Sequence, residues 1–212
     1  MMHKIFFASA LACFIVTSFA ATANEVVRSP QYLQSQMQFE MFPGRYKYLM
    51  IGDSITERGH WADMFPGIGI GNRGIGGDDT SGMIARIDAL KKTGATKVFI
   101  MAGTNDLTRH VDPAVIASNI ILIAKELALE GITPIVQSTL YSGRLRAWKN
   151  PKIDQINAFL MAKCEAEGFI FVNLNKKLAP NGYLPDELTI DGTHLTALGY
   201  AAWREELVSF IK

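Results

Sequence analysis

A serine placed between a predicted strand and a predicted helix is the first candidate for chemistry in this chain. Gly52, Asp53 and Ser54 directly follow the apolar run 48–51, which has the character of a buried strand. A serine at that point meets free backbone N–H groups and a helix terminus, which favour an alkoxide nucleophile. Taken alone, the tripeptide is more typical of an ordinary helix-capping serine, so the interpretation depends on finding a base.

The choice of base is narrow because only three histidines, His60, His110 and His194, follow residue 23. His194 ends the sequence Asp191-Gly192-Thr193-His194, just before a predicted terminal helix. A carboxylate three residues before an imidazole can fix its tautomer and leave the other ring nitrogen to take the serine proton. Alone, this segment is typical of a surface turn. His60 and His110 are expected at the rim or surface, although each has an aspartate nearby in sequence.

Two further segments offer donors for the oxyanion of an acyl-transfer reaction. Asn105 follows the apolar run 98–102, and its side-chain amide is expected on the same rim as Ser54. The glycine-rich run 72–78 follows the second predicted strand, and Gly77 is its best candidate for a backbone N–H donor. Alone, the segment around Asn105 is also consistent with an ordinary turn.

The order of apolar runs predicts the elements that must position these residues. Strands are expected near 48–51, 68–70, 98–102, 135–136 and 169–174, and helices around 83–90, 115–129, 153–160 and from about 197. Asp112-Pro113 and Asn150-Pro151 are typical helix starts. The Gln-rich segment 29–38 is expected only as a polar lead. This alternation predicts an α/β fold with a five-stranded parallel sheet covered on both faces, and functional groups at the strands' carboxyl ends.

The first 23 residues are predicted to be a signal peptide, which leaves 24–212 as one domain. A short basic start precedes the apolar run 5–20 and the Ala21-Thr22-Ala23 cleavage pattern. The protein is therefore expected to be exported, either periplasmic or secreted. A retained membrane anchor and a lipoprotein signal at Cys13 are the alternatives. Cleavage would leave Cys164 as the sole cysteine, so no intrachain disulfide is expected.

Composition argues against several classes of partner. The formal charge is +1, and loss of Lys4 with the leader brings it to about zero. The chain has no run of Lys and Arg, so neither nucleic-acid binding nor a polybasic membrane patch is expected. The segment 69–74 formally matches a dinucleotide fingerprint, but no clear first strand precedes it, so a dinucleotide cofactor is not expected.

Together the four segments resemble those of the SGNH (GDSL-type) hydrolases. The matching residues are Gly-Asp-Ser-Ile at Ser54, the glycine-rich run ending at Gly77 and Asp78, Gly-Thr-Asn-Asp at Asn105, and Asp-x-x-His at Asp191 and His194. The resemblance implies a flavodoxin-like three-layer α/β/α sandwich and ester hydrolysis through an acyl-enzyme, without metal or cofactor.

In that resemblance, Ser54 is the nucleophile, His194 the base and Asp191 the acid that orients it. The oxyanion hole is formed by the N–H groups of Ser54 and Gly77 and the side chain of Asn105.

The substrate is expected to be a short acyl ester, such as an acetyl group on a carbohydrate. Specificity is expected from the loops 56–64, 78–81, 107–112 and 141–150. The last contains Trp148, which can stack on a sugar, and Arg144 and Arg146, which can hold an anion. The alternative for these three residues is a packed tryptophan and two solvated arginines. A lysophospholipase or thioesterase, and a non-catalytic glycan-binding protein on the same fold, remain alternative functions.

Overall fold

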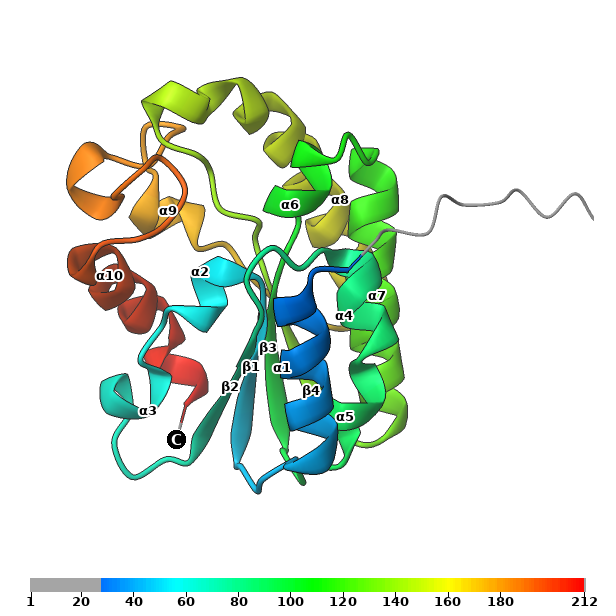
Figure 1. Cartoon of the computed structure of the whole chain (residues 1–212). Helices are drawn as coiled ribbons and strands as arrows, with labels where there is room; N and C mark the ends of the chain where they lie inside the picture. The colour runs from blue at the N-terminus through cyan, green and yellow to red at the C-terminus, as the bar shows by residue number, and fades with distance from the viewer. Residues whose placement is uncertain (1–27, 212) are drawn as a thin grey trace, which may run out of the picture.

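The computed structural model describes residues 28–211, which form a five-stranded, all-parallel sheet with helices on both faces (Figure 1). The strand order is β2-β1-β3-β4-β5. The strands are β1 (Tyr48–Gly52), β2 (Ile70–Gly74), β3 (Lys97–Met101), β4 (Thr133–Gln137) and β5 (Ile170–Val172). The predicted α/β/α fold and strand number are thus confirmed, whereas the predicted signal peptide lies outside the described residues.

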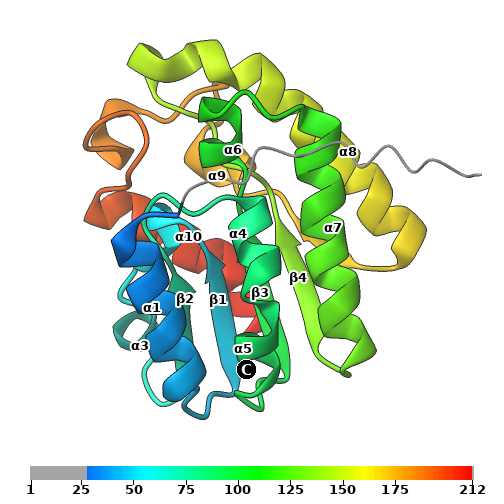
Figure 2. The same cartoon turned by 45° about the vertical axis from the view of Figure 1, so that its right-hand side comes forward.

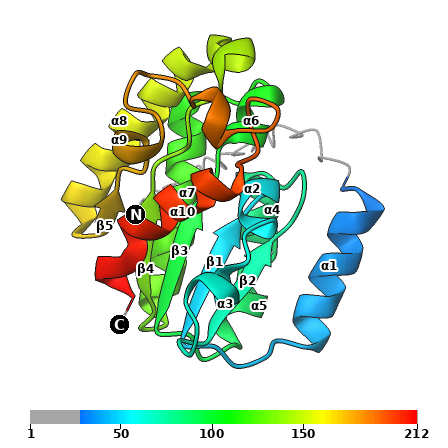
Figure 3. The ribbon, with the colours of Figure 1, turned by 90° about the vertical axis from the view of Figure 1, so that its left-hand side faces the viewer.

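Alternate residues of the strands supply two separate cores. In β1, Leu49 and Ile51 pack on one face of the sheet, and Tyr48 and Met50 pack on the other. A strand buried on both sides requires apolar residues at every position, which is why these strands appear in the sequence as unbroken apolar runs. Helices α4, α5 and α7 lie on one side of the sheet, and α3 and α10 lie on the other (Figures 1 and 3).

The described chain contains the helices that the sequence predicts and several, mostly short, that it does not. They are α1 (Pro30–Met41), α2 (Ser54–Glu57), α3 (Trp61–Met64), α4 (Thr80–Ala85), α5 (Ile87–Lys91), α6 (Thr104–Thr108), α7 (Pro113–Leu129), α8 (Asn150–Glu167), α9 (Asn175–Leu178) and α10 (Ala197–Leu207), with 3-10 helices η1 (Arg144–Lys149), η2 (Asp186–Leu188) and η3 (Val208–Phe210). None of the helices in residues 28–211 is long and apolar enough to cross a membrane.

Three expectations about local structure were wrong. The Gln-rich lead forms helix α1, which stands beside α5 (Figure 2); Ser29 caps this helix by accepting a hydrogen bond from the Tyr32 N–H. The single helix expected around 83–90 is interrupted at Arg86 and forms α4 and α5. Asn150 does not cap α8, because its side chain bonds to the backbone of Ser142 and Gly182 instead.

The second strand begins two residues later than the sequence suggested. It covers most of the segment 69–74 that formally matches a dinucleotide fingerprint, so these glycines form a strand rather than a phosphate-binding loop. The carboxyl ends of β2, β1 and β3 lie side by side, in the 2-1-3-4-5 strand order typical of flavodoxin-like sheets. The loops that follow these three strands therefore meet at one edge of the sheet.

Candidate active site

Ser54 lies just beyond the end of the central strand β1. The strand ends at Gly52, where an added Cβ would lie 2.6 Å from the carbonyl oxygen of Met101, so close packing requires glycine. The Asp53 carboxylate caps α2 by accepting a hydrogen bond of 2.9 Å from the Ile55 N–H. Ser54 is therefore the first residue of the helix rather than its cap, and its side chain is free to make another contact.

That contact is with His194, which is 140 positions away in the sequence. Ser54 Oγ lies 2.9 Å from His194 Nε2, and His194 Nδ1 lies 2.7 Å from Asp191 Oδ2. The second oxygen of Asp191 accepts hydrogen bonds from the backbone N–H groups of His194, at 2.8 Å, and Thr193, at 2.9 Å. The structure thus brings together the three residues that the sequence nominated as nucleophile, base and acid.

The charge of Asp191 favours one tautomer of the imidazole. Partial burial raises the pKa of the Asp191 carboxyl, but hydrogen bonds from His194 and Thr193 outweigh this effect and bring the pKa to about 2. An ionised carboxylate can only accept a hydrogen bond, so Nδ1 carries the proton. Nε2 then presents its lone pair to the Ser54 hydroxyl, as a general base requires.

The segment 189–194 is held by a small set of bonds to its surroundings. Thr189 Oγ1 donates to the His194 carbonyl at 2.8 Å and accepts from the Gly192 N–H at 3.0 Å. On the other side, Arg146 Nε donates to the Asp191 carbonyl at 3.2 Å. The side chain of Asp191 remains 44% exposed and that of His194 is 17% exposed. The acid–base loop is therefore open to solvent.

Gly77 lies in the loop that follows β2, and Asn105 is the second residue of helix α6, which begins just after β3. Asn105 Nδ2 donates to the Asp78 carbonyl at 2.8 Å, and Arg109 Nη2 donates to the Gly77 carbonyl at 2.8 Å. Gly77 has a φ of +74°, which L side chains rarely adopt, and its N–H donates to no acceptor within residues 28–211. The loop is thus clamped by its carbonyl groups while one N–H remains available.

A buried ion pair links this loop to the end of the central strand. Arg86 Nε donates to Asp78 Oδ2 at 2.8 Å, and Arg86 Nη2 donates to the Gly52 carbonyl at 3.2 Å. Burial raises the pKa of Asp78 to about 6, although the Arg86 charge opposes this shift. Burial also raises the pKa of Asp53 to about 7, and the nearby negative charges of Asp78 and Asp106 add to this shift.

The prediction that residues 78–81 form a substrate-facing loop was largely wrong. Asp78, Asp79 and Thr80 are buried, and the Thr80 N–H and hydroxyl both donate to the Asp106 carboxylate. Asp79 pairs with Arg28 and Arg109. These carboxylates hold the three strand-end loops together, a role that sequence spacing alone did not indicate.

The loop 141–150 borders the acid–base segment, as expected for a specificity loop. Trp148 is 62% exposed, so it does not pack in the core. Arg144 Nη2 donates to the Tyr183 hydroxyl at 2.6 Å, whereas Arg146 contacts the backbone of Asp191. Lys149 is buried and donates to Thr108 Oγ1 at 2.8 Å. Nothing in the sequence around Lys149 indicates that this lysine is buried.

The other two histidines lie outside this constellation. His60 is exposed and lies 3.6 Å from Asp63, and His110 is exposed with a φ of +60°. Both are surface residues, as the sequence suggested.

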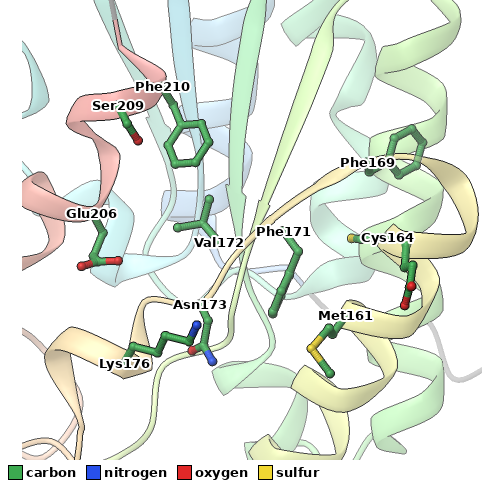
Figure 4. A pocket seen from close by; sticks show the side chains of 11 residues that line it. Met161, Cys164, Phe169, Phe171, Val172, Asn173, Lys176, Glu206, Ser209 and Phe210 are labelled. Atoms are coloured by element: carbon green, nitrogen blue, oxygen red, sulfur yellow. The ribbon is translucent and has the colours of Figure 1, made fainter.

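Two hollows in the described part of the chain differ in whether residues next to the triad line them. One of about 640 Å³ lies at the β5 edge between α8 and η3, where Met161, Phe171 and Phe210 line it (Figure 4). No triad residue lines this hollow. The other, of about 440 Å³, is lined by Leu195, which directly follows His194, and by Arg58, whose N–H donates to the Ser54 carbonyl.

A comparison with known protein families shows to which family the chain belongs. The GDSL-like Lipase/Acylhydrolase family matches residues 50–202, a range that contains all five candidate site residues. The chain belongs to this family. It is therefore an ester hydrolase of the SGNH superfamily, as the sequence resemblance implied. A search of curated proteins gave no match.

Several solved structures share the fold. A protein from Streptococcus pneumonia, named as a candidate platelet activating factor, is 26% identical with a TM-score of 0.74, and the match covers 85% of this chain and 91% of that one. A GDSL-like lipase from Bacteroides thetaiotaomicron is 24% identical with a TM-score of 0.73, covering 84% and 96%. An acetylxylan esterase from Geobacillus stearothermophilus is 20% identical with a TM-score of 0.64, covering 78% and 94%.

Proposed function

We propose that Ser54, His194 and Asp191 form the catalytic triad of a serine esterase that works through an acyl-enzyme. The observation that carries this proposal is the pair of contacts from Ser54 Oγ to His194 Nε2 at 2.9 Å and from His194 Nδ1 to Asp191 Oδ2 at 2.7 Å. This is the arrangement in which an imidazole takes the serine proton and a carboxylate stabilises the resulting imidazolium.

The reaction proceeds in two halves. Ser54 Oγ attacks the ester carbonyl carbon while its proton passes to His194 Nε2, and the carbonyl oxygen becomes an oxyanion. Collapse of this intermediate breaks the bond to the alcohol, which leaves with the proton from His194. A water molecule then gives a proton to His194 and attacks the acyl carbon. When this second intermediate collapses, the bond to Ser54 Oγ breaks, His194 returns the proton to Ser54, and the carboxylic acid leaves.

The oxyanion is stabilised by the N–H groups of Ser54 and Gly77 and by the Asn105 side chain. Asn105 Nδ2 uses one proton for the Asp78 carbonyl, which leaves its second proton for the oxyanion. Arg109 donates to the Gly77 carbonyl and thereby holds the Gly77–Asp78 peptide, which directly follows the Gly77 N–H. Donors that are preorganised in this way stabilise charge as it develops in the transition state.

The substrate is a short acyl ester, with acetyl esters on a carbohydrate as the favoured class. Support comes from the exposed ring of Trp148, in the same loop as Arg146, which contacts Asp191, and from Arg144, which lies 4.6 Å from the centre of the Tyr183 ring. Aromatic faces of this kind stack on sugar rings, and arginine donates to their oxygens. One fold relative is named as an acetylxylan esterase, at 20% identity. Lysophospholipase or thioesterase activity is the alternative.

The test is hydrolysis of p-nitrophenyl acetate, butyrate and decanoate by the wild-type chain and by Ser54→Ala, in buffer with a chelator. We expect the acetate to be cleaved with the highest kcat/KM, and the variant to lose about 10⁴-fold or more in kcat. His110→Asn is the matched surface control. Equal activity of wild type and Ser54→Ala would exclude the triad. A preference for decanoate would favour the lysophospholipase or thioesterase alternative.

A further inference from the structure

A groove beside the candidate triad combines an apolar floor with cationic walls. It has a volume of about 440 Å³ and lies between the segment after α2 and helix α10. Met64, Leu195 and Ala201 supply aliphatic surface, and the Tyr200 ring lies against it. The Tyr200 hydroxyl donates to the Ile55 carbonyl at 2.7 Å, so this ring has a fixed position.

Two arginines border this floor, and one of them is held in place. Arg204 Nε donates to the Met64 carbonyl at 2.7 Å, and its guanidinium lies 5.4 Å from the centre of the Phe65 ring. These contacts leave the two terminal nitrogens of Arg204 free. Arg58 lines the same groove. Burial raises the pKa of the Tyr200 phenol, and the charge of Arg58 partly opposes this shift.

The two arginines that line the groove are both positively charged. Within residues 28–211, neither Arg58 nor Arg204 forms an ion pair. No carboxylate lines the groove. Asp63 lies 3.6 Å from the exposed ring of His60, and Lys177 and, less strongly, the Arg204 charge lower the pKa of the neighbouring Glu205, but neither carboxylate is a lining group. A guanidinium without a partner is suited to bidentate binding of a carboxylate.

We propose that this groove binds an amphipathic carboxylate, with its aliphatic chain on Met64, Leu195 and Ala201 and its carboxylate between Arg58 and Arg204. Neither half of the groove alone would select this ligand. The floor offers few polar groups to a sugar, and a small anion such as acetate would leave the floor uncovered. The inference goes beyond ester cleavage, because binding of the carboxylate does not require turnover.

The experiment is isothermal titration calorimetry of the full chain with acetate, hexanoate, octanoate and uncharged 1-octanol. Burial of one methylene group strengthens binding roughly fourfold, so octanoate, with two more methylene groups, should bind about 16-fold tighter than hexanoate, and acetate should show no binding. Loss of the charge–charge interaction should make 1-octanol at least about 10-fold weaker than octanoate, on the scale of a hydrogen bond to a charged group.

Two variants locate the site. Ala201→Trp fills the groove from an exposed helix position, so octanoate binding should be lost while the fold is kept. Arg58→Gln with Arg204→Gln should reduce octanoate affinity to that of 1-octanol. The matched control is Ala158→Trp, at an exposed position of α8, which should bind octanoate like the wild type.

Several outcomes would overturn the inference. They are absence of octanoate binding to the wild type, equal binding by Ala201→Trp, and equal affinity for octanoate and 1-octanol. Because none of these measurements depends on hydrolysis, they are distinguishable from a failure of the proposed triad. Conversely, loss of esterase activity in Ser54→Ala would leave the octanoate result unchanged.

Discussion

The two halves of the candidate active site are built in different ways. Ser54, Gly77 and Asn105 each follow a parallel strand of the sheet, and the buried Asp78–Arg86 pair joins their loops. The acid–base segment 189–194 lies outside the sheet, and its aspartate side chain is 44% exposed. The sheet therefore fixes where charge develops on the substrate, whereas the base is supplied by a solvent-exposed loop. Substitutions of the buried ion pair should mainly affect folding, whereas substitutions in the acid–base segment at neutral pH should mainly affect catalysis.

The largest effect is expected in the exposed half. His194→Ala removes the group that takes the serine proton, so kcat should fall by about 10⁴-fold or more. The urea midpoint should stay close to that of the wild type, because the loop is open to solvent and its backbone bonds remain. Activity and unfolding are measured on the same preparation. A variant that keeps more than a tenth of the activity would remove His194 from the mechanism.

The second largest effect is expected for the stability of the buried half. Arg86→Met leaves the Asp78 carboxylate buried without its main partner, and we expect a loss of about 3–5 kcal/mol in the free energy of unfolding. The double variant Arg86→Met with Asp78→Asn should recover much of this loss, because a neutral amide needs no counter-charge. Urea denaturation at pH 7.5 measures both proteins. No recovery in the double variant would show that the cost arises from packing rather than charge.

The smallest effect concerns Asp53, whose pKa of about 7 lies above the value of 3.8 for a solvent-exposed carboxyl. The folded state holds this proton more tightly than the unfolded state. The resulting stabilisation is complete below pH 4 and is lost as the pH rises through 7. The free energy of unfolding of wild type relative to Asp53→Asn should therefore fall by roughly 2–4 kcal/mol over this interval, at about 1.4 kcal/mol per pKa unit.

Urea titrations at half-unit pH steps measure this difference. Asp191→Asn serves as the comparison from the exposed half. The pKa of Asp191 is lowered to about 2, so its contribution to stability is present above pH 4 and is lost only below that value. A flat difference between wild type and Asp53→Asn from pH 4 to pH 8 would contradict burial of an unpaired carboxyl.

The sequence predicted the site better than it predicted the surroundings of the site. Ser54, Gly77 and Asn105 each follow an apolar run, so the rule that parallel strands end at one edge was enough to bring them together. Asp191 and His194 are three positions apart in the sequence, so their contact is a local property.

The prediction failed where long-range contacts decide the role of a polar residue. Asp78 and Asp79 look like exposed turn residues in sequence, yet Arg86 and Arg28 compensate their charge in the interior. Asn150 precedes a proline, as a capping residue does, but the Ser142 and Gly182 backbone groups compete for its side chain. Hydrophobic periodicity carries no information on such partners. Helix α1 was missed although Ser29-Pro30 is the same start signal that was used for α7.

The most direct test of the central claim is covalent labelling of the nucleophile. An alkyl fluorophosphonate should react with the chain at a stoichiometry of one, with the Ser54 oxygen displacing fluoride from phosphorus, and peptide mass spectrometry should find the adduct on Ser54. The same treatment of Ser54→Ala and His194→Ala should give no adduct, because the first lacks the oxygen and the second lacks the base that activates it. An adduct on another residue, or equal labelling of wild type and His194→Ala, would contradict the proposed triad.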